Sequence, residues 1–301
     1  MIEVRNLVKR FGTRLALDDV SFQVEPGRVT AFLGPNGSGK TTTMRILLGL
    51  DTATSGSALV DGLPYGRLKD PMCRVGALLD ARNAHPGRSA FHHLRALALT
   101  HGLSSSRVDE VLDDVGLSDV ANNRIGGFSL GMRQRLGIAG AMLGDPRIYV
   151  FDEPVNGLDP DGVRWFRDLV RSFAAEGRAV FLSSHLISEV ALTADQVIVL
   201  GRGRVLADAP IAELARFGSS SKVWVRSPQA GQLTESLRLL GASVDAGIDG
   251  FWVEGIPASR VGNLAAELGA QLHELRTAEN SLEDSYRALT EATVEYRPGL
   301  R

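Results

Sequence analysis

The fold of this chain is decided by the stretch Gly34-Pro35-Asn36-Gly37-Ser38-Gly39-Lys40-Thr41. This stretch matches the pattern G-x-x-x-x-G-K-[ST] and lies between a short apolar run, Val29–Leu33, and a segment with helical spacing. Its glycines let consecutive backbone N–H groups curl around a phosphate, and the positive end of the helix dipole adds to that field. Lys40 supplies a mobile charge for the β and γ phosphates, and the Thr41 hydroxyl can bind Mg²⁺. The stretch therefore predicts a nucleotide site at the start of a parallel α/β core.

Composition supports this interpretation against the alternative of a merely flexible glycine loop. Only four of the 33 basic residues are lysines, so a lysine in this motif is not explained by composition alone. The 301 residues, 44% of them apolar, indicate an ordinary globular protein of about two domains. No apolar run approaches the roughly 18 residues needed to span a bilayer, and Arg5, Lys9 and Arg10 interrupt the N-terminus where a signal peptide has its apolar core. We expect a cytoplasmic protein.

The charge and the cysteine content exclude two further classes. A net charge of -2 lacks the strongly basic balance of a nucleic-acid-binding protein, so no nucleic-acid partner is expected. A single cysteine, Cys73, can form neither an internal disulfide nor a cysteine-based zinc site.

Hydrophobic patterns predict the remaining elements of the core. Alternating apolar residues in the first thirty positions predict a small antiparallel sheet. From about residue 91 to 143, apolar residues recur at helical spacing, which predicts a helical insert at about 80–143 that splits the core. Further elements are predicted as buried strands at 148–151, 179–182 and 197–200, a helix across 163–173 and a closing hairpin at 201–203.

A second, smaller domain is predicted at 217–301, after a first domain at 1–216. Gly218-Ser219-Ser220-Ser221 is typical of a linker. The predicted order that follows is a strand (223–225), a helix (233–240), two strands around 247–250, a helix (261–268) and a strand (272–275). This order resembles a small α+β unit of the ferredoxin-like βαββαβ type. Nothing in it suggests catalysis, and Glu283 and Asp284 are most simply a solvated helix face.

An acidic pair follows one of the predicted buried strands. Asp152 and Glu153 come directly after Ile148–Phe151, and the carboxyl end of a parallel strand lies beside the phosphate loop in this architecture. Asp152 is placed to hold Mg²⁺ through its water shell, and Glu153 can polarise an attacking water. The alternative is a helix N-cap with a neighbouring acid. Together with the loop, the pair favours ATP hydrolysis.

Two more motifs complete a resemblance to a known family. Phe128-Ser129-Leu130-Gly131-Met132-Arg133-Gln134-Arg135 and Ser183-Ser184-His185, taken with the loop and the acids, resemble the ATP-binding subunit of an ATP-binding cassette (ABC) transporter over about residues 1–216. The first of these motifs is similar to the family signature L-S-G-G-Q. Its departures at Phe128, Leu130 and Met132 are similar to those of the drug-export branch, of the bacitracin and anthracycline resistance type.

The resemblance implies roles for residues outside the loop. Ser129 and Gly131 would contact the γ-phosphate of ATP bound to the other copy in a head-to-tail dimer, although Ser129 can equally be a plain N-cap. Asp159 would cross the dimer interface, where the alternative is a turn shaped by its neighbours. His185 would contact the γ-phosphate, although a lone histidine is more often structural.

One aromatic residue and one acidic residue complete these assignments. Phe11 matches the aromatic that stacks on adenine, whereas the residue pattern alone describes a core residue. Asp80 stands where the family has a Mg²⁺-binding glutamine, and relatives of the drug-export branch often carry an acid there. The candidate ATP-binding residues are Phe11, Gly34, Pro35, Asn36, Gly37, Ser38, Gly39, Lys40, Thr41, Thr42, Asp80, Ser129, Gly131 and Asp159; the candidate catalytic residues are Glu153 and His185; the candidate metal ligands are Thr41, Asp80 and Asp152.

The resemblance implies the ATP-hydrolysing subunit of a drug or antibiotic exporter that uses ATP and Mg²⁺. Such a subunit works with an integral membrane permease, lies on the inner face of the cell membrane, and uses the insert as its docking surface. The alternatives are a soluble ABC ATPase acting on DNA repair or ribosomes, and a non-hydrolytic regulatory cassette. The exported compound stays open among drug, antimicrobial peptide, lipid and sodium, because the family's substrate pathway lies in the permease.

Overall fold

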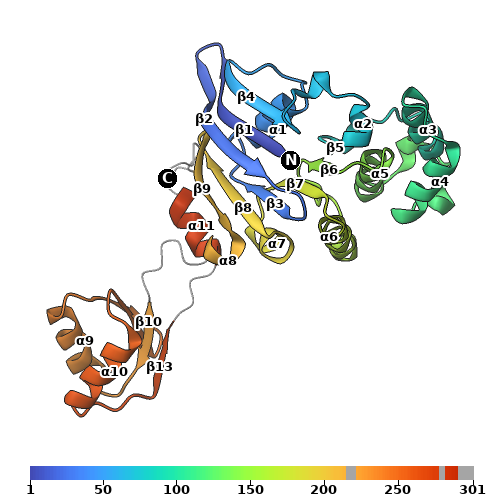
Figure 1. The fold of residues 1–301 in the computed structure, drawn as a ribbon. Helices are drawn as coiled ribbons and strands as arrows, with labels where there is room; N and C mark the ends of the chain where they lie inside the picture. Colours follow the sequence, from blue (N-terminus) through green and yellow to red (C-terminus); the bar gives the residue numbers. More distant parts are fainter. Residues whose placement is uncertain (215–221, 278–281, 291–301) are drawn as a thin grey trace. The chain divides into compact units, whose positions relative to one another are not determined.

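The computed structural model describes residues 1–214, 222–277 and 282–290 of the chain (Figure 1). Met1–Ile211 belong to one compact unit and Ala212–Leu289 to another. The predicted linker at 218–221 and the predicted boundary after residue 216 lie outside the described residues. In the described parts of the chain, no helix combines the length and the apolar character that crossing a membrane requires.

The first unit is built around a six-stranded sheet. In spatial order its strands are β5 (Val75–Leu78), β6 (Ile148–Phe151), β7 (Ala179–Ser184), β3 (Val29–Leu33), β8 (Gln196–Gly201) and β9 (Arg204–Pro210). The first five pair in parallel, and β9 is antiparallel to β8. Every residue of β3, β6 and β7 is buried, as expected for parallel strands covered on both faces. The predicted parallel core is confirmed.

A smaller antiparallel sheet packs on this core. Its strands, in the order β2-β1-β4, are β1 (Ile2–Phe11), β2 (Arg14–Val24) and β4 (Ser55–Val60). Phe22 on β2 contacts Phe32 and Phe181 of the large sheet, with ring centroids 5.3 and 5.4 Å apart. Such tilted aromatic contacts within one apolar cluster tie the two sheets together. The first two strands confirm the predicted antiparallel sheet, whereas β4 was not predicted.

Helices flank the large sheet, and the phosphate-loop helix enters from the end of β3. They are α1 (Lys40–Leu47), α2 (Pro71–Arg74), α6 (Pro160–Ala175) and α7 (Ile187–Thr193). The short α8 (Ile211–Leu214) begins at the last residue of this stretch of the first unit. On α6, Phe166, Val170 and Phe173 are buried at helical spacing, as their pattern predicts.

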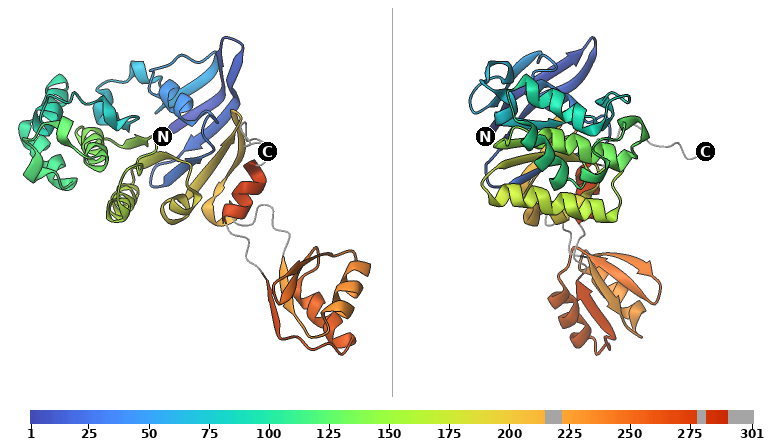
Figure 2. Two further views of the ribbon diagram at one scale, coloured as in Figure 1. Left: turned by 180° about the vertical axis from the view of Figure 1, so that it is seen from behind. Right: turned by 90° about the vertical axis from the view of Figure 1, so that its right-hand side faces the viewer.

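The predicted helical insert is present between β5 and β6. It consists of α3 (Ala90–Thr100), α4 (Ser105–Asp114) and α5 (Leu130–Met142). Figures 1 and 2 show these helices grouped beyond the β5 edge of the large sheet. Leu94 on α3, Val111 on α4 and Leu136 on α5 are almost fully buried, so the helices share apolar faces. The insert is therefore a packed subdomain that can present its outer surface to another protein.

The second unit has a four-stranded antiparallel sheet of order β11-β12-β10-β13. Its elements along the chain are β10 (Val223–Arg226), α9 (Ala230–Leu239), β11 (Ser243–Gly247), β12 (Gly250–Glu254), α10 (Ala258–Glu267), β13 (Glu274–Thr277) and α11 (Leu282–Thr290). The first six follow the predicted order, although the last strand begins two residues later than expected. Glu283 on α11 is exposed, as predicted, and the side chain of Asp284 lies outside the described part of the chain.

Candidate nucleotide-binding and hydrolysis site

The glycine-rich loop joins the carboxyl end of β3 to the first turn of α1. Gly37 and Gly39 adopt φ angles of 81° and 112°, a left-handed region that glycine alone enters without strain. A Cβ atom on Gly34 would lie 2.4 Å from the carbonyl oxygen of Leu200, so the chain approaches too closely there for any side chain. The loop borders a cleft of about 660 Å³. Its lining comprises Phe11, Arg14, Leu15, Ala16, Asn36, Gly37, Ser38, Gly39, Lys40, Thr41, Thr42, Glu153 and Arg202.

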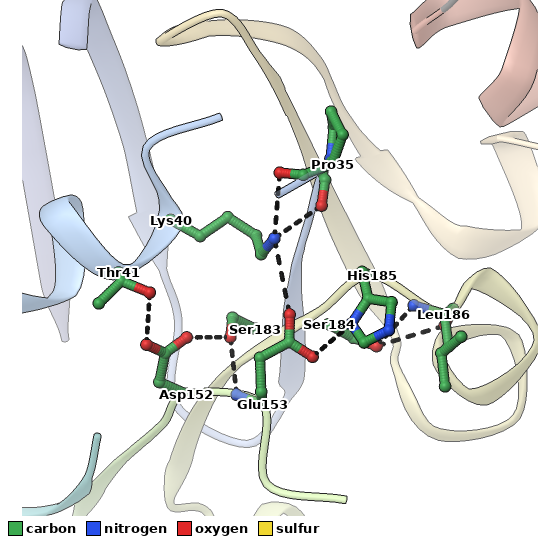
Figure 3. Close-up of polar contacts among 10 residues, drawn as sticks. Pro35, Lys40, Thr41, Asp152, Glu153, Ser183, Ser184, His185 and Leu186 are labelled. Carbon is green, nitrogen blue, oxygen red and sulfur yellow. Dashed lines mark hydrogen bonds and ion pairs between the residues drawn. The ribbon is translucent and has the colours of Figure 1, made fainter. Parts of the chain in front are cut away.

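Lys40 is the buried cation of this cleft, with a side chain 6% exposed (Figure 3). Its Nζ donates hydrogen bonds to the carbonyl oxygens of Gly34 at 2.6 Å and Pro35 at 3.4 Å, and lies 3.6 Å from Oε1 of Glu153. Burial lowers the pKa of Lys40, and the negative charges of Glu153 and Asp152 oppose that shift. The ammonium is thus only partly compensated by the protein, which suits it to an anionic ligand.

Asp152 lies at the centre of a short network of hydroxyl groups. Thr41 Oγ1 donates to Oδ2 of Asp152 at 2.6 Å, and Ser183 Oγ donates to Oδ1 at 2.5 Å. The Thr41 hydroxyl and the Asp152 carboxylate are therefore adjacent, and both are oxygen ligands of the kind that Mg²⁺ takes beside phosphate oxygens. These residues fit a magnesium ion held jointly by the protein and a nucleotide.

Glu153 connects this network to His185. Its Oε2 is 2.8 Å from Nδ1 of His185, and its backbone N–H donates to Ser183 Oγ at 2.8 Å. The φ angle of Glu153 is 49°, in the left-handed region that non-glycine residues rarely occupy and that is found at functional sites. Neither acid caps a helix, because α6 begins at Pro160 with Asp159 as its N-cap. The helix-cap alternative for the acidic pair is therefore wrong.

Three predicted residues lie away from this cluster and take part in helix ends. Ser129 Oγ accepts from the backbone N–H of Met132 at 3.2 Å as the N-cap of α5, and Asp159 Oδ1 accepts from that of Gly162 at 2.7 Å. A Cβ atom on Gly131 would lie 3.0 Å from the carbonyl oxygen of Gly157. The signature segment and the segment before α6 thus pack against each other, and neither Ser129 nor Asp159 lines the cleft of its own chain.

Asp80 is also separate from the loop cleft. Arg82 donates to its carboxylate from the backbone N–H at 2.9 Å, from Nε at 3.0 Å and from a terminal guanidinium nitrogen at 3.2 Å. The hydrogen bonds from Arg82 lower the pKa of Asp80, so this carboxylate stays ionised. Asp80 borders an apolar groove of about 500 Å³ between the core and the insert.

Sequence analysis gave no role in the site to three residues that the structure places there. Ser183 bridges the two acids, and Arg14 and Arg202 line the loop cleft. The signal for Ser183 was its place two residues before His185 on the same strand end. Arg14 is the first residue of β2 and Arg202 lies in the turn between β8 and β9, and the sequence alone gives no reason to place either beside a phosphate loop.

Comparison with family models gives two matches. Residues 17–156 match the model described as ABC transporter, and residues 221–283 match one described as a domain of unknown function. The first match spans the loop, the signature segment and the acidic pair. The second coincides with the four-stranded unit.

Individual relatives agree with the first match. The lantibiotic transport ATP-binding protein SrtF of Streptococcus pyogenes is 36% identical over 68% of this chain and 89% of its own length. The bacitracin transport ATP-binding protein BcrA of Bacillus licheniformis is 37% identical over 72% of each chain. A solved dimeric structure of the ATP-binding cassette MJ0796, in a post-hydrolysis state bound to ADP and Pi, has a TM-score of 0.64 and 25% identity, and covers 70% of this chain and 99% of that one. The chain belongs to the family of ATP-binding proteins of ABC transporters.

Proposed function

We propose that the protein hydrolyses ATP to power the export of an antibiotic-like compound through a separate membrane permease. The observation that carries this proposal is the polar cluster beside the phosphate loop, in which Glu153 lies 3.6 Å from Lys40 and 2.8 Å from His185, and Asp152 accepts from Thr41. The names of the bacitracin and lantibiotic transport relatives support the substrate class. The protein then works at the inner face of the cell membrane, where the permease holds it.

In this proposal the loop grips the nucleotide through its backbone N–H groups and Lys40, which contacts the β and γ phosphates. Phe11, 49% exposed at the cleft, stacks on adenine. Thr41 and Asp152 would hold Mg²⁺, which would supply positive charge to the phosphate oxygens, and Asp80 is a further candidate ligand. To bind the metal ion, the Asp80 carboxylate would first have to give up its hydrogen bonds from Arg82.

Hydrolysis in this proposal depends on Glu153 and His185. Glu153 accepts a proton from the attacking water, and His185, hydrogen-bonded to it, reaches the γ-phosphate. Ser129, Gly131 and Asp159 of a second, head-to-tail copy complete each site. The dimeric state of the solved cassette supports this arrangement. Two copies would close on two ATP molecules and reopen after hydrolysis.

The apolar groove beside Asp80 is the docking surface proposed for the permease. Leu50, Leu97 and Leu136 line it, and Leu50 is 56% exposed. An apolar groove between helices suits the apolar face of a helix from a partner protein. Because the groove also reaches Asp80, a partner seated there would be close to a candidate metal ligand.

The first test is whether a neighbouring gene encodes a protein with about six transmembrane helices, and the second is reconstitution with that protein. ATP hydrolysis is measured in vesicles with and without bacitracin or a lantibiotic, and Glu153→Gln is the matched inactive control. Stimulation by one of these compounds supports the proposal. An ATP hydrolysis rate that is unchanged by these compounds and by the permease, but is raised by DNA or ribosomes, would instead support the alternative of a soluble ABC ATPase.

A further inference from the structure

The turn between β8 and β9 holds an arginine in a backbone conformation that long side chains rarely adopt. In this hairpin Gly201 pairs with Arg204. The two residues between them, Arg202 and Gly203, form the turn, with φ angles of 46° and 76°. A two-residue hairpin turn with both φ angles positive is of type I′ and favours Asn, Asp or Gly at its first position. Arg202 therefore occupies a position at which the hairpin alone favours asparagine.

Arg202 belongs to a small set of non-glycine residues with left-handed φ angles. In the described part of the chain this set has eight members, of which six are Asn or Asp, the residue types that tolerate the conformation: Asn6, Asp19, Asp61, Asp70, Asp145 and Asp249. The other two are Glu153 and Arg202, and both border the cleft beside the phosphate loop. Strained backbone is found at functional sites, and Glu153 is the proposed base of this one. A function in the same cleft would account for the strain at Arg202.

The turn is anchored both to the phosphate loop and to β2. The backbone N–H of Gly203 donates to the carbonyl oxygen of Ser38 in the loop at 2.9 Å, and the N–H of Asp18 on β2 donates to that of Gly203 at 2.8 Å. A Cβ atom on Gly203 would lie 2.5 Å from the carbonyl oxygen of Ala16, so these segments pack backbone against backbone. The main chain of Arg202 is thus held in a fixed position between β2 and the loop.

This position corresponds to the middle of the proposed nucleotide. In the proposed binding mode adenine stacks on Phe11 and Lys40 contacts the β and γ phosphates, and both residues border the cleft. Phe11 pairs with Arg14 at the start of β2, so the adenine lies at the β2 side of the turn and the outer phosphates at the loop side. The ribose and the α-phosphate join these two ends. Of these two groups, only the phosphate is charged.

We infer that the Arg202 guanidinium binds the α-phosphate of the nucleotide. The inference rests on the proposed function and adds to that site a phosphate-binding residue outside the glycine-rich loop. A guanidinium is always charged and donates paired N–H groups that match two oxygens of one phosphate. Because ATP and ADP both contain the α-phosphate, this contact stabilises the bound nucleotide before and after hydrolysis.

The test uses the opposite demands of the turn and of the ligand. Arg202→Asn gives the turn a residue that it favours, so without nucleotide this variant should unfold about 1 to 3 °C above the parent chain. Its dissociation constants for ATP and for ADP, measured by competition with a fluorescent ATP analogue, should each rise roughly tenfold because a hydrogen-bonded charge is lost. Arg202→Lys keeps the charge but loses the paired donors, so its dissociation constants should lie between those of the parent and of Arg202→Asn.

Arg204→Asn is the matched control on the same hairpin. Arg204 is exposed, and its Nε donates to the carboxylate of Asp18 at 2.7 Å. Among the described residues, the lining of the loop cleft includes Arg202 and does not include Arg204. Arg204→Asn changes the net charge by the same amount as Arg202→Asn, but it should change both dissociation constants by less than about twofold.

The inference is overturned if Arg202→Asn binds both nucleotides as tightly as the parent. It is also overturned if weaker binding comes with a lower unfolding temperature, because Arg202 would then stabilise the fold. A loss for ATP alone would place the arginine at the γ-phosphate and refute the assignment to the α-phosphate. If Lys40→Ala loses affinity and Arg202→Asn does not, the proposed nucleotide site stands and only the role of Arg202 is refuted. A parent chain that binds neither nucleotide would refute the proposed site itself, and this inference with it.

Discussion

Ser183 links the two acids of the site through one hydroxyl, and its removal is the sharpest test of the proposed mechanism. The Oγ atom is fully buried at the end of β7, where it donates to Asp152 at 2.5 Å and accepts from the backbone N–H of Glu153 at 2.8 Å. Ser183→Ala removes both contacts and leaves that N–H without its partner. Neither acid is changed chemically, so any effect comes from their position.

The expected size of the effect follows from these two bonds. A hydrogen bond to a charged group contributes about 1.5 to 3 kcal/mol, and a neutral one about 1 kcal/mol. Because Glu153 has a left-handed φ angle, the lost N–H contact also releases a backbone that the surroundings must hold. The two bonds together contribute about 3 kcal/mol. If half or more of this free energy is lost from stabilisation of the transition state, kcat falls roughly 10- to 100-fold. ATP affinity without Mg²⁺ should change little, since the loop and Lys40 are untouched.

Ser184→Ala is the matched control. Ser184 is also buried, but its Oγ bonds to the backbone of Leu186 and to neither acid. Steady-state ATP hydrolysis, titration of Mg²⁺ and thermal unfolding are measured on both variants. The reasoning is refuted if Ser183→Ala keeps kcat within about twofold of the wild type, or if the two variants lose activity and stability equally.

Four further outcomes are expected. Lys40→Ala should lose roughly 100-fold in affinity for a fluorescent ATP analogue, because a charge-assisted contact to two phosphates disappears, and unchanged affinity would contradict the loop assignment. Burial lowers the pKa of Lys40, and a bound triphosphate should raise it again. ATP binding should therefore take up protons between neutral pH and the ordinary lysine pKa of about 10.4. Calorimetry in two buffers should detect this proton uptake in the wild type and not in Lys40→Arg. Glu153→Gln should bind ATP, hydrolyse it at least about 100-fold more slowly and accumulate as a dimer in light scattering, whereas monomer with near wild-type hydrolysis would exclude a base at this position. Asp80→Ala should raise the Mg²⁺ concentration for half-maximal hydrolysis while Asp80→Gln retains most activity, and superimposable titrations would make Asp80 only a partner of Arg82.

Local patterns were sufficient to predict the elements that form the site. The strands β3, β6 and β7 begin with short apolar runs, and each is followed directly by a predicted site residue, namely Gly34, Asp152 or His185. The strand β4 was missed because Gly56 is read from sequence as a break. In the structure its φ is 79°, and a Cβ atom there would lie 2.1 Å from the carbonyl oxygen of Asn6 on β1. Glycine is needed at this position because β4 pairs closely there with Asn6 of β1, fifty residues earlier in the chain.

Side-chain partners were harder to predict than positions. Ser183 was noted as part of a motif, but its link to Asp152 and Glu153 depends on the parallel register of β6 and β7, which joins residues about thirty positions apart. Asp80 was predicted from resemblance to bind a metal, and the sequence gave no reason to expect that Arg82, two residues later, holds its carboxylate at three points. Metal binding by Asp80 stays a prediction that requires this local pair to open.

The side of the second unit's sheet that faces away from its apolar cluster shows the same limit for a whole surface. Alternation along each strand places Trp224 and Trp252 away from the apolar cluster, but it does not say which residues flank them. That order depends on pairing β10 with both β12 and β13, and β12 with β11, across up to about fifty residues of chain. Only this register brings Glu274 of β13 beside Trp224, whose Nε1 donates to its carboxylate at 3.2 Å, and lets the same carboxylate pair with Arg276 at 3.1 Å. Alternation predicts which side chains share a face, but the strand pairing decides which of them neutralise one another.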